Sequence, residues 1–124
     1  MQEPKADKKT IGVAPSNETI LNALAESGHF QTDADAAKFA MAYAVDCEVG
    51  RGVAEGSNTK WNVGTFDDSD RTIRAFVEAM YPDEQNPYRQ VEYLINEGLN
   101  LLKQKYADGA VPDVAELIYS KSGD

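Results

Sequence analysis

An alanine-rich stretch between residues 34 and 45 constrains the fold of this chain more than any other segment. Gly28 is suited to end one helix in a left-handed turn, and Thr32 begins the next, with Asp35 three residues later as in a capping box. So short a connection predicts an αα-hairpin or a helix-turn-helix corner. Because alanine side chains are small, the second helix can be approached very closely by another helix.

The composition is that of one globular domain. A chain of 124 residues is about one domain long, and its single cysteine, Cys47, excludes an internal disulfide. We find no signal peptide and no apolar run long enough to cross a membrane, so we expect a soluble cytoplasmic protein. Residues 1–10 are polar and predict a flexible arm, and residues 11–124 predict a single helical domain.

The predicted fold class is all-α, with about five helices. Apolar periodicity, caps and stop signals place them near residues 16–27, 32–48, 69–81, 87–107 and 112–119. Asn86 is the expected cap of the fourth helix, with Pro87 at its first position. A glycine-rich central loop spans residues 49–66, with short extended pieces that would make a small hairpin. In the third helix, an apolar stripe is expected to face the core, and it consists of Ile73, Phe76, Val77 and Met80.

No catalytic or metal-binding pattern is present. Cys47 and His29 lie near opposite ends of a helix about 24 Å long, too far apart for a nucleophile and its base. Cys47 is therefore expected to be a buried small residue and His29 a turn residue. The acidic run Asp67, Asp68 and Asp70 lacks the rest of a calcium loop and is better explained by the start of a helix. We predict no catalytic residues, metal or cofactor, and a binding protein rather than an enzyme.

Small residues supply the first candidate surface. Gly98 interrupts the longest apolar stripe at a cost of about 1 kcal/mol relative to alanine, which indicates a close approach by another element. Tight packing within the chain and pairing of two copies both fit. We predict a homo-oligomer whose interface contains Ala36, Ala37, Ala40, Ala44 and Gly98.

Basic residues near two aromatic side chains supply the alternative surface. With Trp61 and Phe66 they would bind an anion and stack on a base, which predicts direct nucleic-acid binding or processing. The net charge of −9 disfavours this hypothesis, and the aromatic residues are equally suited to cover the core. The basic residues in question are Arg51, Lys60, Arg71 and Arg74.

Two short motifs resemble those of a known group of proteins. The segment Phe30-x-Thr32-x-x-Asp35, continuing into Lys38-Phe39-Ala40-x-Ala42, resembles a motif in small proteins associated with bacterial DNA-phosphorothioation (Dnd-type) gene clusters. Tyr93-x-x-x-x-Gly98-Leu99 is similar to their second recurring feature, and the resemblance extends from about residue 11 to residue 106. It implies an accessory role in a modification or defence system and carries over no catalytic or binding residue. The 50–64 loop and the fifth helix lie outside the match.

These patterns predict a non-catalytic bacterial interaction module that self-associates and serves a nucleic-acid modification or defence assembly. Its expected partners are a second copy and another protein of that assembly, without a membrane. An acidic surface suits a basic partner, such as a protein that itself binds nucleic acid.

Overall fold

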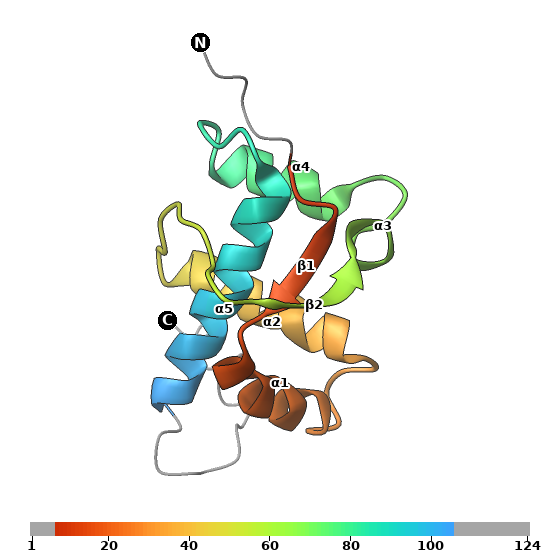
Figure 1. Cartoon of the computed structure of the whole chain (residues 1–124), viewed down its shortest axis with the longest axis vertical. Coiled ribbons are helices and arrows are strands. Elements are labelled where there is room, and N and C mark those ends of the chain that lie inside the picture. Colours follow the sequence, from red (N-terminus) through yellow and green to blue (C-terminus); the bar gives the residue numbers. More distant parts are fainter. Residues whose placement is uncertain (1–6, 106–124) are drawn as a thin grey trace.

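The fold is mixed α/β. The computed structural model describes residues 7–105, in which helices surround a two-stranded antiparallel sheet (Figure 1). The all-α prediction is therefore wrong. The helix predicted over residues 112–119 lies outside the described residues. In chain order the elements are β1 (Thr10–Val13), the 3-10 helix η1 (Pro15–Asn17), α1 (Glu18–Ala25), α2 (Asp33–Asp46), β2 (Asn58–Asn62), α3 (Val63–Phe66), α4 (Thr72–Met80) and α5 (Pro87–Lys105).

The sheet joins the start of the chain to the predicted central loop. Thr10 lies opposite Asn62 and Val13 opposite Asn58, with a register shift after Ile11. Gly12 permits this pairing, because a Cβ there would come within 2.7 Å of the Asn58 carbonyl oxygen. The two strands are short and far apart in sequence, and β1 falls at the end of the segment expected to be an arm. The small hairpin predicted within residues 49–66 is therefore wrong: an extended piece of that loop is β2, but its partner is β1. Local periodicity gave no sign of this partner.

Helices α1 and α2 form the predicted hairpin. The Thr32 side chain accepts a hydrogen bond from the Asp35 backbone N–H at 3.1 Å, which confirms the predicted cap. Gly28 has a φ of 89°, the left-handed conformation expected of a helix stop. At the other end of α2, the backbone N–H groups of Glu48 and Val49 bond back to the last turn, and Glu48 adopts a φ of 64°. This is a Schellman ending with glutamate where glycine is usual.

The core lies between α2 and α5, which cross in close contact (Figure 1). Gly98 of α5 sits directly against the backbone of Ala40, so that a Cβ at Gly98 would overlap the Ala40 carbonyl oxygen. Four alanines of α2 are fully buried, namely Ala36, Ala37, Ala40 and Ala44. The apolar residues that α5 contributes to the core are also fully buried, and they include Leu94, Ile95, Leu99 and Leu102.

The start of the chain is fastened to α5. Asp7 accepts hydrogen bonds from the backbone N–H groups of Tyr88 and Arg89 at 2.9 and 3.1 Å, so it caps α5 in the role expected of Asn86. Lys8 forms an ion pair with the buried Glu92 at 2.8 Å. The arm predicted over residues 1–10 is thus bound at residues 7–10, and residues 1–6 lie outside the described part.

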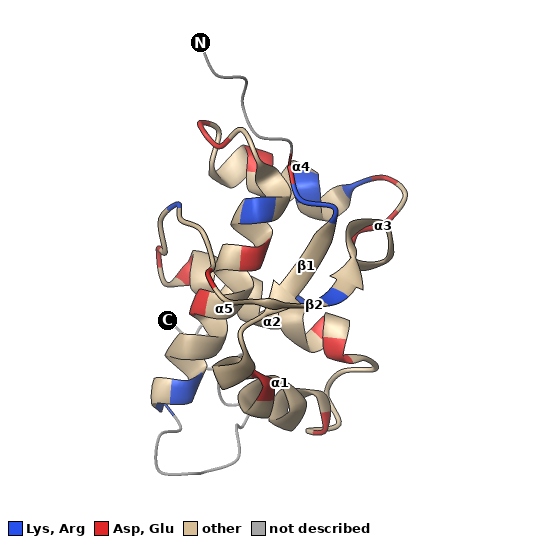
Figure 2. Cartoon of the chain, viewed as in Figure 1, with Lys and Arg blue, Asp and Glu red and all other residues tan. Residues whose placement is uncertain are grey.

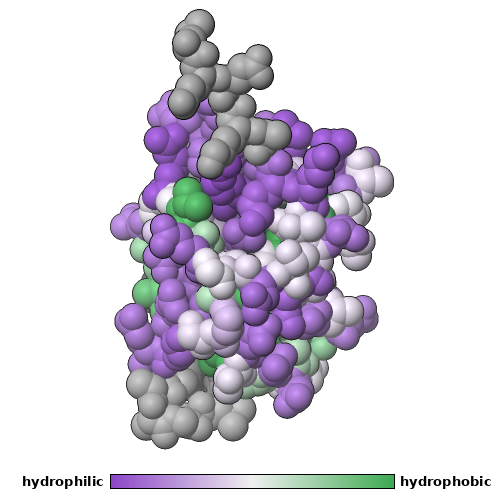
Figure 3. All heavy atoms as spheres, viewed as in Figure 1, coloured by the Kyte–Doolittle hydropathy of each residue, from purple (hydrophilic) through white to green (hydrophobic). Residues whose placement is uncertain are grey.

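Charges of both signs are spread over the elements, with the acidic ones in excess (Figure 2). The face in Figure 3 is mostly hydrophilic, with hydrophobic residues as separate small areas. In the part of the chain that the structure describes, no helix is both long and apolar enough to span a bilayer.

Candidate functional site

A network of buried polar side chains fixes β1 against α5. Glu92 and Asn96 lie one turn apart on α5 and are 2% and 6% exposed. Glu92 accepts a hydrogen bond from the Gly12 N–H at 2.8 Å, while Asn96 donates to the Gly12 carbonyl at 3.1 Å and accepts from the Ala14 N–H at 2.8 Å. Side chains of α5 thereby form the hydrogen bonds that a third strand would otherwise form. The Gly12 and Ala14 backbone groups that point away from β2 all have partners.

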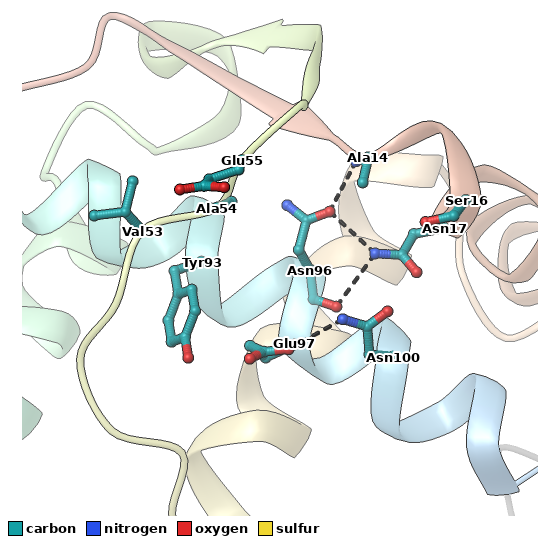
Figure 4. Close-up of a pocket in the computed structure, with 10 residues that line it drawn as sticks. All are labelled: Ala14, Ser16, Asn17, Val53, Ala54, Glu55, Tyr93, Asn96, Glu97 and Asn100. Atoms are coloured by element: carbon teal, nitrogen blue, oxygen red, sulfur yellow. Dashed lines mark hydrogen bonds between the residues drawn. The ribbon is translucent and has the colours of Figure 1, made fainter.

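The same network forms the floor of a cavity of about 360 Å³. In Figure 4 the 53–55 segment passes across α5, and Tyr93, Glu97 and Asn100 project from α5 beside it. Asn17, a buried residue of η1, donates from Nδ2 to the carbonyl oxygen of Asn96 at 3.3 Å and closes the floor. The cavity is lined by Ala14, Ser16, Asn17, Val53, Ala54, Glu55, Tyr93, Asn96, Glu97 and Asn100.

Tyr93 is held rigidly at this cavity. A Cβ at Gly52 would collide with the Tyr93 ring, so the glycine backbone packs directly on it. Burial, and after it the hydrogen bond and negative charge of Glu97, raise the pKa of the Tyr93 phenol. The phenol therefore stays protonated at neutral pH. Asn100 donates to Glu97 Oε2 at 3.0 Å and fixes the carboxylate in turn.

The small residues proposed as an interface are enclosed within the chain. Ala36, Ala37, Ala40 and Ala44 are fully buried, and Gly98 contacts Ala40. The close helix pair is thus the one between α2 and α5 of a single chain, so this face offers no surface to a second copy. Self-association stays a prediction that needs another surface.

The four basic residues of the alternative hypothesis come from three places in the fold: Arg51 from the loop before β2, Lys60 from β2, and Arg71 and Arg74 from the start of α4. Arg51 donates to the Asp83 carbonyl at 2.8 Å, Lys60 lies 3.8 Å from Glu18, and Arg74 lies 3.7 Å from Glu78. Figure 2 shows the basic residues distributed over separate elements. The aromatic residues are also unsuited to stacking. Phe66 is 1% exposed, and Trp61 packs on Phe66 and donates from its indole N–H to Asp33.

The start of α4 is closed to an external anion by two carboxylates of the chain. Buried Asp67 accepts from the N–H groups of Ile73 and Arg74, and Asp68 accepts from that of Thr72. The Tyr88 hydroxyl also donates to Asp67 at 2.8 Å, and burial together with this neighbouring carboxylate raises the pKa of Tyr88 to about 12. Asp67 and Asp68 are therefore helix-capping residues, as the sequence suggested, and Arg71 reaches the left-handed region (φ 56°) to begin the helix.

Two further expectations are settled by position. Cys47 is exposed at the end of α2, so the prediction that it is buried is wrong. His29 is exposed in the turn between α1 and α2, as predicted. Within residues 7–105, no three His, Cys, Asp or Glu side chains are grouped so as to hold a metal ion.

Helix α4 presents the clearest apolar surface. Its predicted core stripe is divided, because Val77 is fully buried while Phe76 and Met80 are 37% and 50% exposed. Besides Val53 in the loop before β2, these are the only large hydrophobic side chains of the described residues that are classed as exposed. The spacing of apolar residues in the sequence identified this side of α4, although it was expected to face the core. The sequence gave no direct sign of the hydrogen bonds between Asn17 and Asn96.

No protein-family model, curated protein or solved structure compared with this chain matches it.

Proposed function

We propose that the chain is a non-catalytic interaction module that self-associates through the exposed side of α4. The observation that supports this is the exposure of Phe76 and Met80, which lie one turn apart on a helix that places the neighbouring Val77 in the core. Large side chains of this kind gain about 1.5–3 kcal/mol on full burial, and these two retain part of that gain for a partner. Paired exposed hydrophobic residues on an amphipathic helix are typical of a contact surface.

A second copy suits this surface because the residues that flank Phe76 on the same face of α4 are small and uncharged. Thr72 and Ala79 lie four residues before and three residues after Phe76, and both are exposed. Two α4 helices that cross at Phe76 would bury the same patch on each copy, as the two-fold symmetry of an isologous dimer requires. A helix of 9 residues is only about 13.5 Å long, so the contact is small and the dimer is expected to be weak.

We further propose that this module serves a nucleic-acid modification system or a defence system. The support for this part is the resemblance of the 30–42 and 93–99 segments to Dnd-associated proteins. Direct nucleic-acid binding has less support, because Arg51, Lys60 and Arg74 have separate partners within the chain.

Sedimentation velocity over a wide concentration range tests the self-association. We expect the sedimentation coefficient of the wild type to rise with concentration, and the rise to be lost in the Phe76→Ser/Met80→Ser variant. Val53→Ser, which removes an equally exposed apolar side chain elsewhere, is the matched control and should dimerise normally.

A wild type that stays monomeric at the highest concentration reached, or a double serine variant that associates like the wild type, contradicts the proposal.

A further inference from the structure

We propose that the cavity between the 53–55 segment and α5 is a binding site for a guanidinium group. The proposal concerns a different surface from α4 and does not depend on self-association. It rests on the hydrogen-bonding character of the lining, on its charge and on the position of the Tyr93 ring.

Amide donors of the lining are turned toward the protein. Both Nδ2 hydrogen bonds of Asn96 go to backbone carbonyls, those of Gly12 and Glu92, at 3.1 and 2.8 Å. Asn17 Nδ2 is directed at Asn96, and Asn100 Nδ2 at Glu97. A ligand that enters the cavity therefore meets mainly oxygen acceptors.

The charge of the lining is negative. Glu55 and Glu97 line the cavity, and neither forms an ion pair with any residue in the described range 7–105. The ammonium of Lys103 donates to the Ser16 carbonyl and to Asn17 Oδ1 at 3.2 and 3.1 Å, so it is held by the neutral side of the lining. A lining with two carboxylates and no basic side chain repels anions and favours a cation.

The aromatic ring selects a flat cation. Tyr93 lines the cavity, and the Gly52 backbone holds its ring in place. A guanidinium stacks on an aromatic face and makes paired hydrogen bonds to a carboxylate, whereas an ammonium is a compact, strongly hydrated charge. Figure 4 shows Glu97 beside Tyr93 on α5 and Glu55 on the segment that passes over them, so a ring face and carboxylates are both available to a guanidinium. At about 360 Å³ the cavity is near the lower end of the range for small-ligand sites, about 300–1,000 Å³.

This chemistry has two sources, the arginine side chain of a partner protein and a small free guanidinium compound. We would titrate the full chain, labelled with ¹⁵N, with N-acetyl-arginine amide and follow the backbone amide signals. The expected result is a saturable shift of the signals of residues 53–55 and Asn100. N-acetyl-citrulline amide, which has almost the same shape without the charge, should give no saturable shift, and N-acetyl-lysine amide should bind more weakly.

Variants assign the binding to the two carboxylates. Glu55→Gln and Glu97→Gln should each weaken arginine amide about tenfold, the usual consequence of losing a charge-assisted hydrogen bond. Glu26→Gln makes the same change of charge on an exposed residue outside the lining and should have no effect. Because Glu55 is exposed in a loop, its variant keeps the test valid if Glu97→Gln perturbs folding.

A comparison of agmatine with an acetylated Gly-Arg-Gly amide peptide separates the two sources. Tighter binding of the peptide supports a partner's arginine, and tighter binding of agmatine supports a free compound. Equal shifts with the arginine and citrulline amides, or unchanged affinity in both glutamine variants, overturn the proposal.

Discussion

Replacing Gly98 by alanine tests the central packing of the molecule. On an exposed helix this change stabilises by about 1 kcal/mol, because alanine is the better helix former. Here the new Cβ would overlap the carbonyl oxygen of Ala40, a backbone atom that cannot rotate away, so α5 and α2 must separate. Overpacking of a core costs about 1–3 kcal/mol, and a clash with backbone belongs at the upper end of that range. The net expectation is a loss of about 2 kcal/mol.

Urea unfolding, followed by circular dichroism and by the fluorescence of the single tryptophan, Trp61, measures the change. The midpoint should fall without a change in slope, because the unfolded state is unaltered. Gly64→Ala is the matched control, since Gly64 lies in helical α3 and a Cβ there meets nothing within 4 Å. This control should be neutral or slightly stabilising. If Gly98→Ala is as stable as the wild type or more so, the close contact between α2 and α5 is refuted.

Three further predictions concern other parts of the structure. Asn96→Ala should destabilise by about 3 kcal/mol in urea unfolding, because it leaves several buried backbone groups without partners, whereas Asn100→Ala should cost under about 1 kcal/mol. The pKa of Tyr88 is raised from 10.0 to about 12 in the folded protein. The protonated phenol therefore contributes fully to the free energy of unfolding below pH 10, and this contribution is lost as the pH rises toward 12. Alkaline unfolding of Tyr88→Phe should therefore depend less steeply on pH than that of the wild type, although Tyr88→Phe should itself cost about 1 kcal/mol at neutral pH by removing the bond to Asp67. Glu48→Gly should stabilise the protein by about 0.5–1 kcal/mol, because Glu48 holds a left-handed conformation that glycine adopts without strain. The thermal midpoint should therefore rise slightly, and an unchanged or lower midpoint would contradict the assigned helix ending.

Local patterns predicted the helices because their signals lie close together in sequence. The Thr32 cap, the Gly28 stop and the beginning of α5 at Pro87 each depend on a few adjacent residues. Gly98 predicted a close approach, and Ala40 provides it. What no local pattern supplied was the choice between a neighbour in the same chain and one in a second copy. That choice depends on how the whole chain folds back, and burial of the alanines decides it for the single chain.

The sheet and the candidate site escaped prediction for one shared reason. The polar positions of Glu92 and Asn96 interrupt the apolar side of α5 and indicate that something polar must meet them. Apart from Lys8, which pairs with Glu92, the partners that fix β1 are backbone groups of residues 12 and 14, and these have no side-chain signature to match. Without β1 in place, the cavity has no floor, and its acceptor-rich character is hidden as well. The Asn96 amide turns inward because the outer edge of β1 needs a donor and an acceptor, and Glu55 and Glu97 are the charged groups of the lining. Asn96 thus completes the hydrogen bonds of the edge strand and also forms the floor of the cavity. A variant that disrupts Asn96 should therefore impair both folding and the binding of arginine amide.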